Sequence, residues 1–406
     1  MSGQGEPPLP IATRMVRDMA AGKGYGKRVK STGNHSPGRS RMPNSMACGI
    51  DIGDSTSLAS VYSPSGELVD RFEFEMNSKG YEFASMRVPK EARIACEATG
   101  MTYPLVRALE GYGYDVTVAN PKQLKWIVKS KKKSDKVDSE KLARLLMVGM
   151  LPEAHLMSRE EQRTRDLLVQ RVLLGREIGR MKARILSYLK REGLNEGLPK
   201  TEDNFSVARR NAIRSLEFDD VRYLVMKTMM DGLEFLEGQC PPLELEIKKF
   251  ARESEGVKIL MSIGGVDYYS ASLYSSIIGD VNRYPDDDHL ASYLGVIPAE
   301  GESSGVKRVG KMSKDGPSLG RWVLDIMAGN AVRYNPPIRQ YYQSALRRTG
   351  RAKKAKVLTM RKLVRMTYFM LKKRENWKYE KRELTEGKLS RLRSTGRDGD
   401  DEGGDT

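Results

Sequence analysis

The sequence predicts an α/β domain followed by a helical spacer and a mainly α second domain. Short apolar runs at 47–52, 92–98 and 115–119 have the length and the flanking turn residues of strands. Residues 159–192 repeat apolar side chains at the period of one long helix. From residue 256, apolar segments alternate with glycine-bearing turns. The length of 406 residues suffices for two or three domains.

The composition favours a nucleic acid as partner. Lys and Arg number 70 and Asp and Glu number 53, which gives a net charge of +17. Such an excess binds polyanions through phosphate contacts and counterion release. The chain has 3 Cys without a CxxC pair and 3 His without a second His or Cys at ligand spacing. This argues against a zinc knuckle, a disulfide framework and Ser–His–Asp catalysis, so carboxylates and hydroxyls must carry any chemistry.

The ends of the chain differ from its middle. Residues 1–46 are rich in Gly, Pro and basic residues and are expected to form a disordered basic arm, or in part to precede a start at Met42 or Met46. Residues 381–406 are expected to form a disordered tail. No apolar run has the length of a membrane span, so we expect a cytoplasmic protein with no membrane partner.

The first domain is expected over residues 47–155. Its elements are predicted in the order strand Ala47–Ile52, hairpin strands Ser57–Ser63 and Leu68–Met76, strand Ala92–Ala98, helix Tyr103–Glu110, strand Asp115–Ala119 and helix Ser134–Met150. The last helix carries an apolar face of Val137, Leu142, Leu145 and Leu146, which indicates that it packs against the rest of the domain.

A helical spacer is expected over residues 156–255. Its long helix carries a heptad-like seam of Leu174, Ile178, Met181, Ile185 and Leu189. This seam can pack within one chain or pair two subunits. The second reading predicts a homo-oligomer, either a dimer or a tetramer.

The second domain is expected over residues 256–380. It is predicted to contain helices at 271–278, 320–333 and 337–348 and a loop at 301–314. Between Arg347 and Arg374 there are 12 Lys and Arg and no acidic residue. We expect this basic segment, with Lys353, Lys354 and Lys356, to contact a phosphate backbone.

Two carboxylates lie on predicted strands. Asp51 stands between Ile50 and Ile52, so strand alternation places its side chain on the opposite face from theirs. Glu97 ends the apolar strand that begins near residue 92. Each acid alone is also compatible with a solvated position at a strand end. A buried carboxylate needs a partner, and that partner is often a metal.

Two more carboxylates, Asp135 and Asp138, stand three residues apart near the start of a predicted helix. They project from one helix face, and such a pair repels unless a cation neutralises it. Capping of the helix dipole by first-turn acids is the alternative. Four carboxylates from two strands and a helix suit two Mg²⁺ ions, or Mn²⁺ in their place. Lysines precede the helix and can hold DNA phosphates, or can form only a solvated loop. They are Lys122, Lys125, Lys129, Lys131, Lys132 and Lys133.

Three motifs resemble one known family. Gly49–Gly53, Cys96–Gly100 and Ser134–Asp138 resemble the RNase H/RuvC-like domain of the DEDD insertion-sequence transposases, the family of the Piv DNA invertase. The family's C-terminal transposase domain is matched by the segments Ser262–Val266, Leu290–Pro298, Ser303–Lys307 and Ser313–Gly316. Asp315 departs from the basic residue usual in the family. The resemblance covers residues 46–375 approximately.

The resemblance implies a transposase that cuts and rejoins DNA. It implies a serine nucleophile, for which we choose Ser304 with Ser303 as fallback, assisted by Asp51, Glu97, Asp135 and Asp138 as metal ligands. Basic residues near the serine are expected to contact nucleic acid, namely Lys307, Arg308, Lys311 and Lys314. Some family members are guided by a noncoding bridge RNA, so donor DNA, target DNA and such an RNA are the expected partners. The implied setting is a prokaryotic cytoplasm, in association with the nucleoid.

Other functions remain compatible with the residues. A RuvC-like nuclease or junction resolvase would use the four acids and water without a covalent intermediate. A non-catalytic nucleic-acid-binding protein would need the charge but not the acids. A sugar-kinase-like ATPase would need a second nucleotide-binding half, whereas the sequence after residue 150 turns helical.

Overall fold

The computed structural model describes residues 45–127, 135–216, 219–303 and 306–394. The first part of the chain forms a five-stranded sheet in the order β3-β2-β1-β4-β5. The strands are β1 (Ala47–Asp51), β2 (Thr56–Tyr62), β3 (Leu68–Glu75), β4 (Arg93–Glu97) and β5 (Val116–Ala119). The first three strands pair antiparallel, and β1, β4 and β5 run parallel to one another. The predicted α/β class is confirmed, and most expectations for the arm at 1–46 lie outside the described residues.

Two layers of side chains cover the two faces of this sheet. Cys48 and Ile50 of β1 belong to the core beneath α2 (Ser78–Arg87) and α3 (Thr102–Gly111). Ala47 lies in the core on the opposite face, with Leu142 and Leu146 of α5 (Asp135–Met147). Strand alternation thus divides β1 between two buried faces, as expected for a central strand.

Helix α2 was not predicted. Asn77 accepts a hydrogen bond from the backbone N–H of Gly80 at 2.9 Å, so the helix begins with a side-chain cap. Its sequence has a glycine and few long aliphatic residues, so it lacks a clear apolar period. The short helix α4 (Pro121–Ile127) was also missed.

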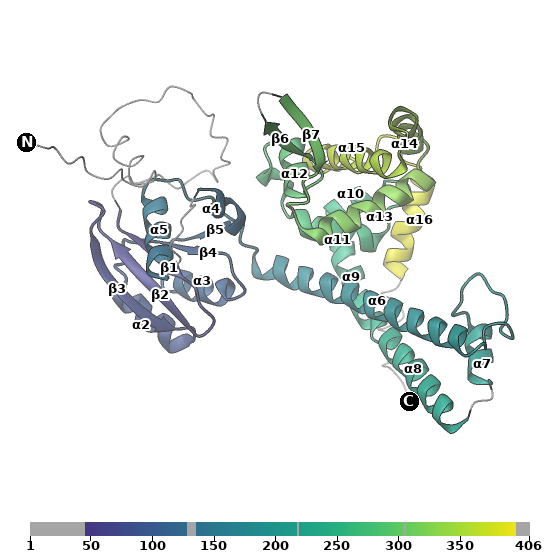
Figure 1. Cartoon of the computed structure of the whole chain (residues 1–406). Helices are drawn as coiled ribbons and strands as arrows, with labels where there is room; N and C mark the ends of the chain where they lie inside the picture. Colours follow the sequence, from purple (N-terminus) through teal and green to yellow (C-terminus); the bar gives the residue numbers. More distant parts are fainter. Residues whose placement is uncertain (1–44, 128–134, 217–218, 304–305, 395–406) are drawn as a thin grey trace, which may run out of the picture.

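Helix α6 (Arg159–Arg191) confirms the predicted long helix and begins at a capping box formed by Ser158 and Glu161. Its far half packs on α7 (Val207–Arg214) and α8 (Asp220–Gly238), with which it forms a hairpin (Figure 1). Ile185 and Leu189 of the predicted seam are fully buried there against Met230 and Leu233 of α8. The seam therefore packs within the chain, because α8 supplies the apolar partner that a second subunit would otherwise provide.

The second unit is mainly helical, as predicted. Its helices are α9 (Cys240–Glu253), α10 (Glu255–Met261), α11 (Tyr268–Ile278), η1 (Val281–Arg283), α12 (Asp287–Tyr293), α13 (Ser318–Tyr334), α14 (Pro336–Thr349), α15 (Ala352–Lys373) and α16 (Arg382–Ser394). They share one core, to which α6 contributes Leu168 and Val172.

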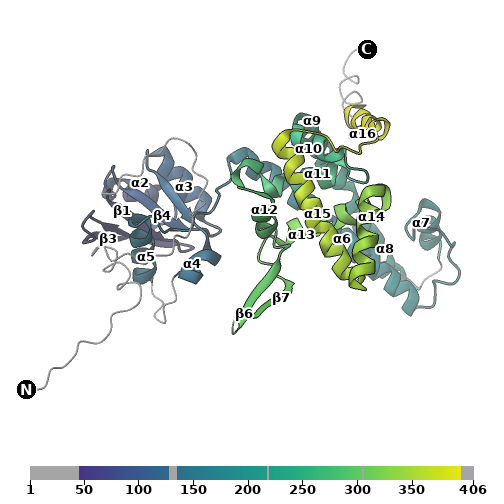
Figure 2. The same cartoon turned by 90° about the horizontal axis from the view of Figure 1, so that it is seen from above.

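Two expectations for this unit are wrong. The loop expected at 301–314 is mostly a ribbon of two antiparallel strands, β6 (Pro298–Ser303) and β7 (Val306–Met312), which projects from the helices in Figure 2. The polar tail expected from residue 381 includes a helix, α16, because Thr385 and Leu392 are buried against the second unit. These buried side chains, together with hydrogen bonds from Lys388 to three backbone carbonyls, hold α16 against the second unit.

Candidate active site

Asp51 and Glu97 meet at the carboxyl edge of the sheet. Each is the last residue of its strand, and the strands β1 and β4 are parallel neighbours in which Ile50 pairs with Cys96. The register places the two acids side by side, about 5 Å apart between strands. Both are half-buried. Alternation from Ile50 and Cys96, which face α3, directs both acids to the face that α5 covers.

Helix α5 is pressed onto the sheet at Gly49. A Cβ at this position would lie 1.9 Å from the carbonyl oxygen of Ser139, so only glycine allows the observed approach. At the other end of α5, Arg93 donates from Nη2 to the carbonyl of Leu146 at 3.1 Å. Arg93 begins β4, so α5 runs antiparallel to β1 and β4 and its first turn lies toward their carboxyl ends. That first turn begins at Asp135.

Polar contacts fix the rotation of α5. The hydroxyls of Ser60 and Ser139 lie 2.9 Å apart in the interior, and Arg71 donates from Nε to Ser60 at 3.0 Å. Glu140 forms an ion pair with Arg144 at 2.8 Å and one with Arg71 at 3.9 Å. Glu140 is thereby held over β2 and β3.

The described side chains do not form a closed metal site. Asp138 is half-buried and forms an ion pair with Lys141 at 2.8 Å. Within the ranges that the structure describes, no group of three or more His, Cys, Asp or Glu side chains could hold a metal ion. The side chain of Asp135 is not among the described ones. Carboxylate oxygens are nevertheless the donors that hard divalent cations prefer, and Asp51, Glu97 and the start of α5 share one face.

The predicted serine segment lies at the ribbon. Ser304 falls outside the described residues, and Ser303 is the last residue of β6. Lys307, Arg308 and Lys311 belong to β7, and Lys314 follows it with a left-handed backbone at φ 59°. The predicted lysine run Lys129, Lys131, Lys132 and Lys133 also lies outside the described residues.

One hydrogen bond joins the domain that carries the acids to the segment that follows the ribbon. The ammonium of Lys122, on α4, donates to the backbone carbonyl of Asp315, which follows the ribbon. Helix α4 begins two residues after β5 ends, at the same edge as the acids. This contact brings the base of the ribbon toward the carboxyl edge, and Lys122 is the first residue of the lysine run that precedes α5.

The cations of the basic segment fall into two groups. Lys353 and Lys354 are exposed at the start of α15. Lys356 instead forms an ion pair with Asp325 of α13 at 2.7 Å, so its charge is already engaged. The exposed side chains farther along the helix are Lys362, Arg365, Phe369, Lys372 and Lys373. The four cations belong to the predicted basic segment, whereas Phe369 was not singled out. Their helical spacing could have indicated one face, and the Arg365 guanidinium lies 5.9 Å from the Phe369 ring.

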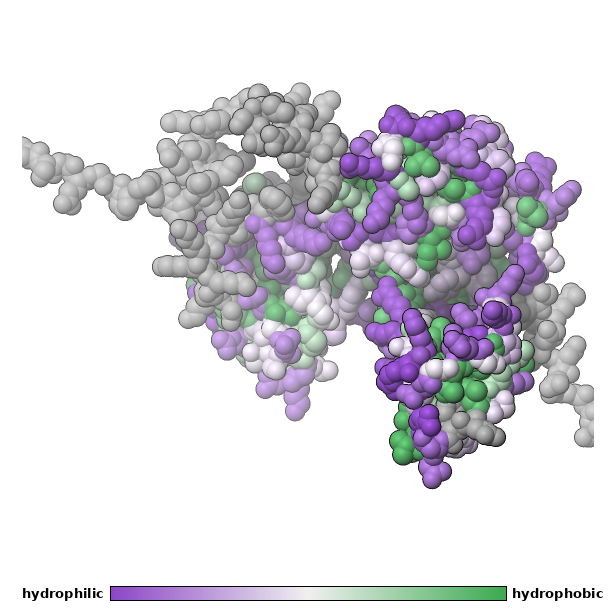
Figure 3. Space-filling model, turned by 45° about the vertical axis from the view of Figure 1, so that its right-hand side comes forward, coloured by the Kyte–Doolittle hydropathy of each residue, from purple (hydrophilic) through white to green (hydrophobic). Residues whose placement is uncertain are grey.

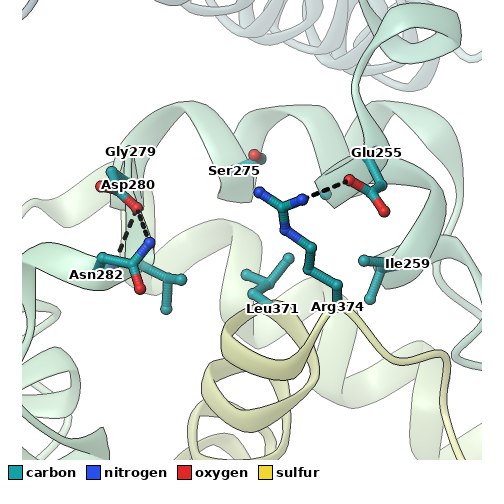
Figure 4. Close-up of a pocket in the computed structure, with 10 residues that line it drawn as sticks. Glu255, Ile259, Ser275, Gly279, Asp280, Asn282, Leu371 and Arg374 are labelled. Carbon is teal, nitrogen blue, oxygen red and sulfur yellow. Dashed lines mark hydrogen bonds and ion pairs between the residues drawn. The ribbon is translucent and has the colours of Figure 1, made fainter.

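A separate cavity of about 210 Å³ lies between α10, α11, η1 and α15. Figure 4 shows Arg374 reaching across it toward Glu255, and their charged atoms are 3.9 Å apart. The cavity is lined by residues of the second unit, so it is distinct from the carboxyl edge of the sheet.

The sheet order and the acids at its edge define an RNase H-like domain attached to a helical second unit. Residues 48–192 match the family DEDD_Tnp_IS110, described as "Transposase", and residues 257–343 match the "Transposase IS116/IS110/IS902 family". The chain belongs to the IS110/IS116 family of insertion-sequence transposases.

Three relatives agree with this assignment. The "Transposase for insertion sequence element IS1328" of Yersinia enterocolitica is 23% identical over 280 residues, which cover 68% of this chain and 80% of that protein. The "Transposase for insertion sequence element IS1533" of Leptospira borgpetersenii is 24% identical over 252 residues, 59% of this chain and 71% of that protein. The "Probable family 20 transposase" of Pseudomonas aeruginosa is 28% identical over 109 residues, but the match spans only 27% of this chain and 32% of the relative.

The DEDD domain implies dependence on a divalent metal. In the described ranges no helix is both long and apolar enough to span a membrane.

Proposed function

We propose that this chain cuts and rejoins DNA at the ends of an insertion sequence, by phosphodiester transesterification. The observation that carries the proposal is the pairing of Asp51 and Glu97 at the ends of parallel neighbouring strands, on the face where α5 begins. Parallel strands direct their carboxyl ends to one edge, where ligands of α/β proteins bind. The relatives named as transposases for insertion sequences support the choice of substrate.

Asp51, Glu97, Asp135 and Asp138 are the proposed ligands of two Mg²⁺ ions, for which Mn²⁺ can substitute. When bound, such ions lower the pKa of an attacking hydroxyl and stabilise the departing oxygen. Lys141 holds Asp138 in an ion pair at 2.8 Å, so binding requires that this pair open or that the cation join it. Arg71, Ser60 and Ser139 keep α5 in place while this happens.

Ser304 is the proposed nucleophile, with Ser303 as the fallback. Its hydroxyl oxygen attacks a DNA phosphorus and loses its proton, the bond from phosphorus to one deoxyribose oxygen breaks, and that oxygen leaves as a hydroxyl. The resulting serine phosphodiester keeps the energy of the broken bond, so a second DNA hydroxyl can reverse the step and join a new strand. Ser303 is the last residue of β6, and this position at the end of a ribbon strand supports a nucleophile in this segment.

Several partners follow from this proposal. Donor and target DNA are the substrates, and a noncoding bridge RNA is the proposed guide. The net charge of +17 supports polyanionic partners of either kind. A homo-oligomer, dimer or tetramer, would supply two cutting sites, although the α6 seam is covered within the chain. The proposed setting is the cytoplasm of a prokaryote, at the nucleoid.

The alternative is a RuvC-like nuclease that uses water and forms no adduct. A labelled DNA substrate, run on a denaturing gel, separates the two functions. We expect a slowly migrating protein–DNA band with the unaltered chain and none with Ser304→Ala, which should still bind DNA and metal. A band that persists in Ser304→Ala and disappears in Ser303→Ala would move the nucleophile by one residue. Cleavage without any band in the unaltered chain would favour the nuclease.

A further inference from the structure

Three backbone carbonyls converge on one cation in the second unit. The Lys388 ammonium of α16 donates to the carbonyl oxygens of Met261 at 2.7 Å, Ile263 at 3.1 Å and Val266 at 2.9 Å. These oxygens belong to the turn that joins α10 to α11. Met261 ends α10, where carbonyls lack helical partners and a cation is favoured.

The turn is held in a shape that presents these oxygens. Gly265 has φ +90°, and a Cβ there would lie 2.6 Å from the carbonyl oxygen of Asn330, so a side chain is excluded. On the other side, the backbone N–H of Trp377 donates to the hydroxyl of Ser262 at 2.8 Å, and this hydroxyl donates to the Ile259 carbonyl at 2.6 Å. The three carbonyls are thus positioned by contacts other than those of Lys388.

Lys388 is half-buried, and its ammonium binds these three carbonyls. Burial, as the largest influence, lowers the pKa of Lys388 below its usual value. Within the described part of the chain, the hydrogen bonds of the ammonium go to backbone carbonyls and to no carboxylate. Carbonyl oxygens in such a cluster replace the hydration shell of a potassium ion in other proteins. Ammonium and potassium ions are similar in charge and size.

We propose that the carbonyls of Met261, Ile263 and Val266 form a monovalent-cation site, which the chain fills with its own Lys388 ammonium and which takes K⁺ when that ammonium is removed. The site connects α16 to the turn between α10 and α11. That turn lies within the family match at 257–343, whereas α16 lies beyond it. The site is independent of the carboxylates and of the serine.

The test is thermal unfolding of Lys388→Met, whose side chain ends one atom short of the ammonium. Lys381→Met is the matched control, since Lys381 is exposed beside α16. Samples in KCl, ammonium chloride and choline chloride at equal ionic strength are compared. For Lys388→Met we expect K⁺ and ammonium to raise Tm saturably above the choline value, by about 2–4 °C at high occupancy. The unaltered chain and Lys381→Met should show no such difference.

A Tm of Lys388→Met that is the same in all three salts, or that responds to ammonium alone, would overturn the potassium site. If the variant does not remain soluble, the yield of its refolding from urea is measured in the same salts. A higher yield in KCl than in choline chloride supports the site, and equal failure in every salt overturns it. Anomalous scattering from Rb⁺ in crystals of the variant gives a direct reading, with a peak expected among the three carbonyls.

Discussion

Gly49 lies directly beneath Ser139, and this contact sets how closely α5 approaches the sheet. A Cβ at Gly49 would come within 1.9 Å of the Ser139 carbonyl oxygen and 2.6 Å of the Ala143 nitrogen. Both atoms belong to the backbone of α5, which cannot turn aside as a side chain can. The distance between Asp51 and the first turn of α5 therefore depends on the absence of a methyl group two residues before the acid.

Gly49→Ala should lift α5 and impair both stability and DNA cleavage. Overpacking of this kind costs about 1–3 kcal/mol. Gly111→Ala is the control, because a Cβ at Gly111 would meet no atom of the described residues within 4 Å. Urea denaturation and the cleavage assay measure the two effects. Equal midpoints for Gly49→Ala and the unaltered chain would show that α5 can shift without cost.

Asp51→Asn and Asp138→Asn should each abolish strand cleavage in Mg²⁺ while the fold persists, because an amide oxygen lacks the charge that holds the ion. Glu140→Gln lies on the same helix but is paired with Arg144, so it should stay active. Circular dichroism checks the fold, and isothermal titration with Mn²⁺ checks metal binding. Full activity of either Asn variant would refute the assignment.

Replacing Lys353 and Lys354 together by Gln should weaken DNA binding at all sequences. It should also reduce the slope of log affinity against log salt by roughly 0.9 for each lost phosphate contact. Lys356→Gln should leave the slope unchanged and lower stability instead, because it breaks the ion pair with Asp325. Binding titrations from low to high salt distinguish the two variants. The same slope change in both would show that the ion pair opens on DNA.

Changing Ile178 and Ile185 to Asp should unfold the hairpin of α6 and α8, since Ile185 is fully buried within the chain. A loss of helical signal in circular dichroism is expected. Phe235→Asp is the control, because Phe235 is 68% exposed on α8. On the face drawn in Figure 3, apolar patches interrupt the hydrophilic surface. A folded monomer from the double variant, detected by light scattering, would instead place the seam between subunits.

The cysteines should differ in reactivity. Burial raises the pKa of the Cys48 and Cys96 thiols to about 12, so both stay protonated and unreactive at pH 8. Cys240 is only half-buried. A disulfide reagent should label one thiol in the native chain and all 3 in denaturant. As the pH rises toward 12, ionisation of the two buried thiols should oppose folding. Rapid native labelling of all three would show that the sheet opens readily.

The sequence predicted the central strands β1 and β4 well, because each is an unbroken apolar run and the acid at its end, Asp51 or Glu97, marks where the run stops. It placed Asp51 and Glu97 on strands but did not predict the register that sets them side by side, since register depends on contacts between distant segments. The ribbon at 298–312 has the sequence features of a loop because Gly, Ser and charged residues interrupt the alternation. Helix α16 was missed because Lys388 counts as polar in composition, whereas its contacts are with buried carbonyls. The ion pair between Lys356 and Asp325 could not be predicted, because the two residues lie on different helices, α15 and α13, and no short sequence pattern connects them.

Helix α6 belongs to two hydrophobic cores at once. Leu168 and Val172 are buried with the second unit, and Ile185 and Leu189 are buried with α8. An unbroken helix of 33 residues is about 50 Å long. Because the helix is unbroken and its first half is packed in the second unit, a small rotation of that unit would move the far end of the hairpin by several ångströms. A molecule bound at that end of the hairpin would therefore respond to, or restrict, the orientation of the second unit, which carries the ribbon of β6 and β7.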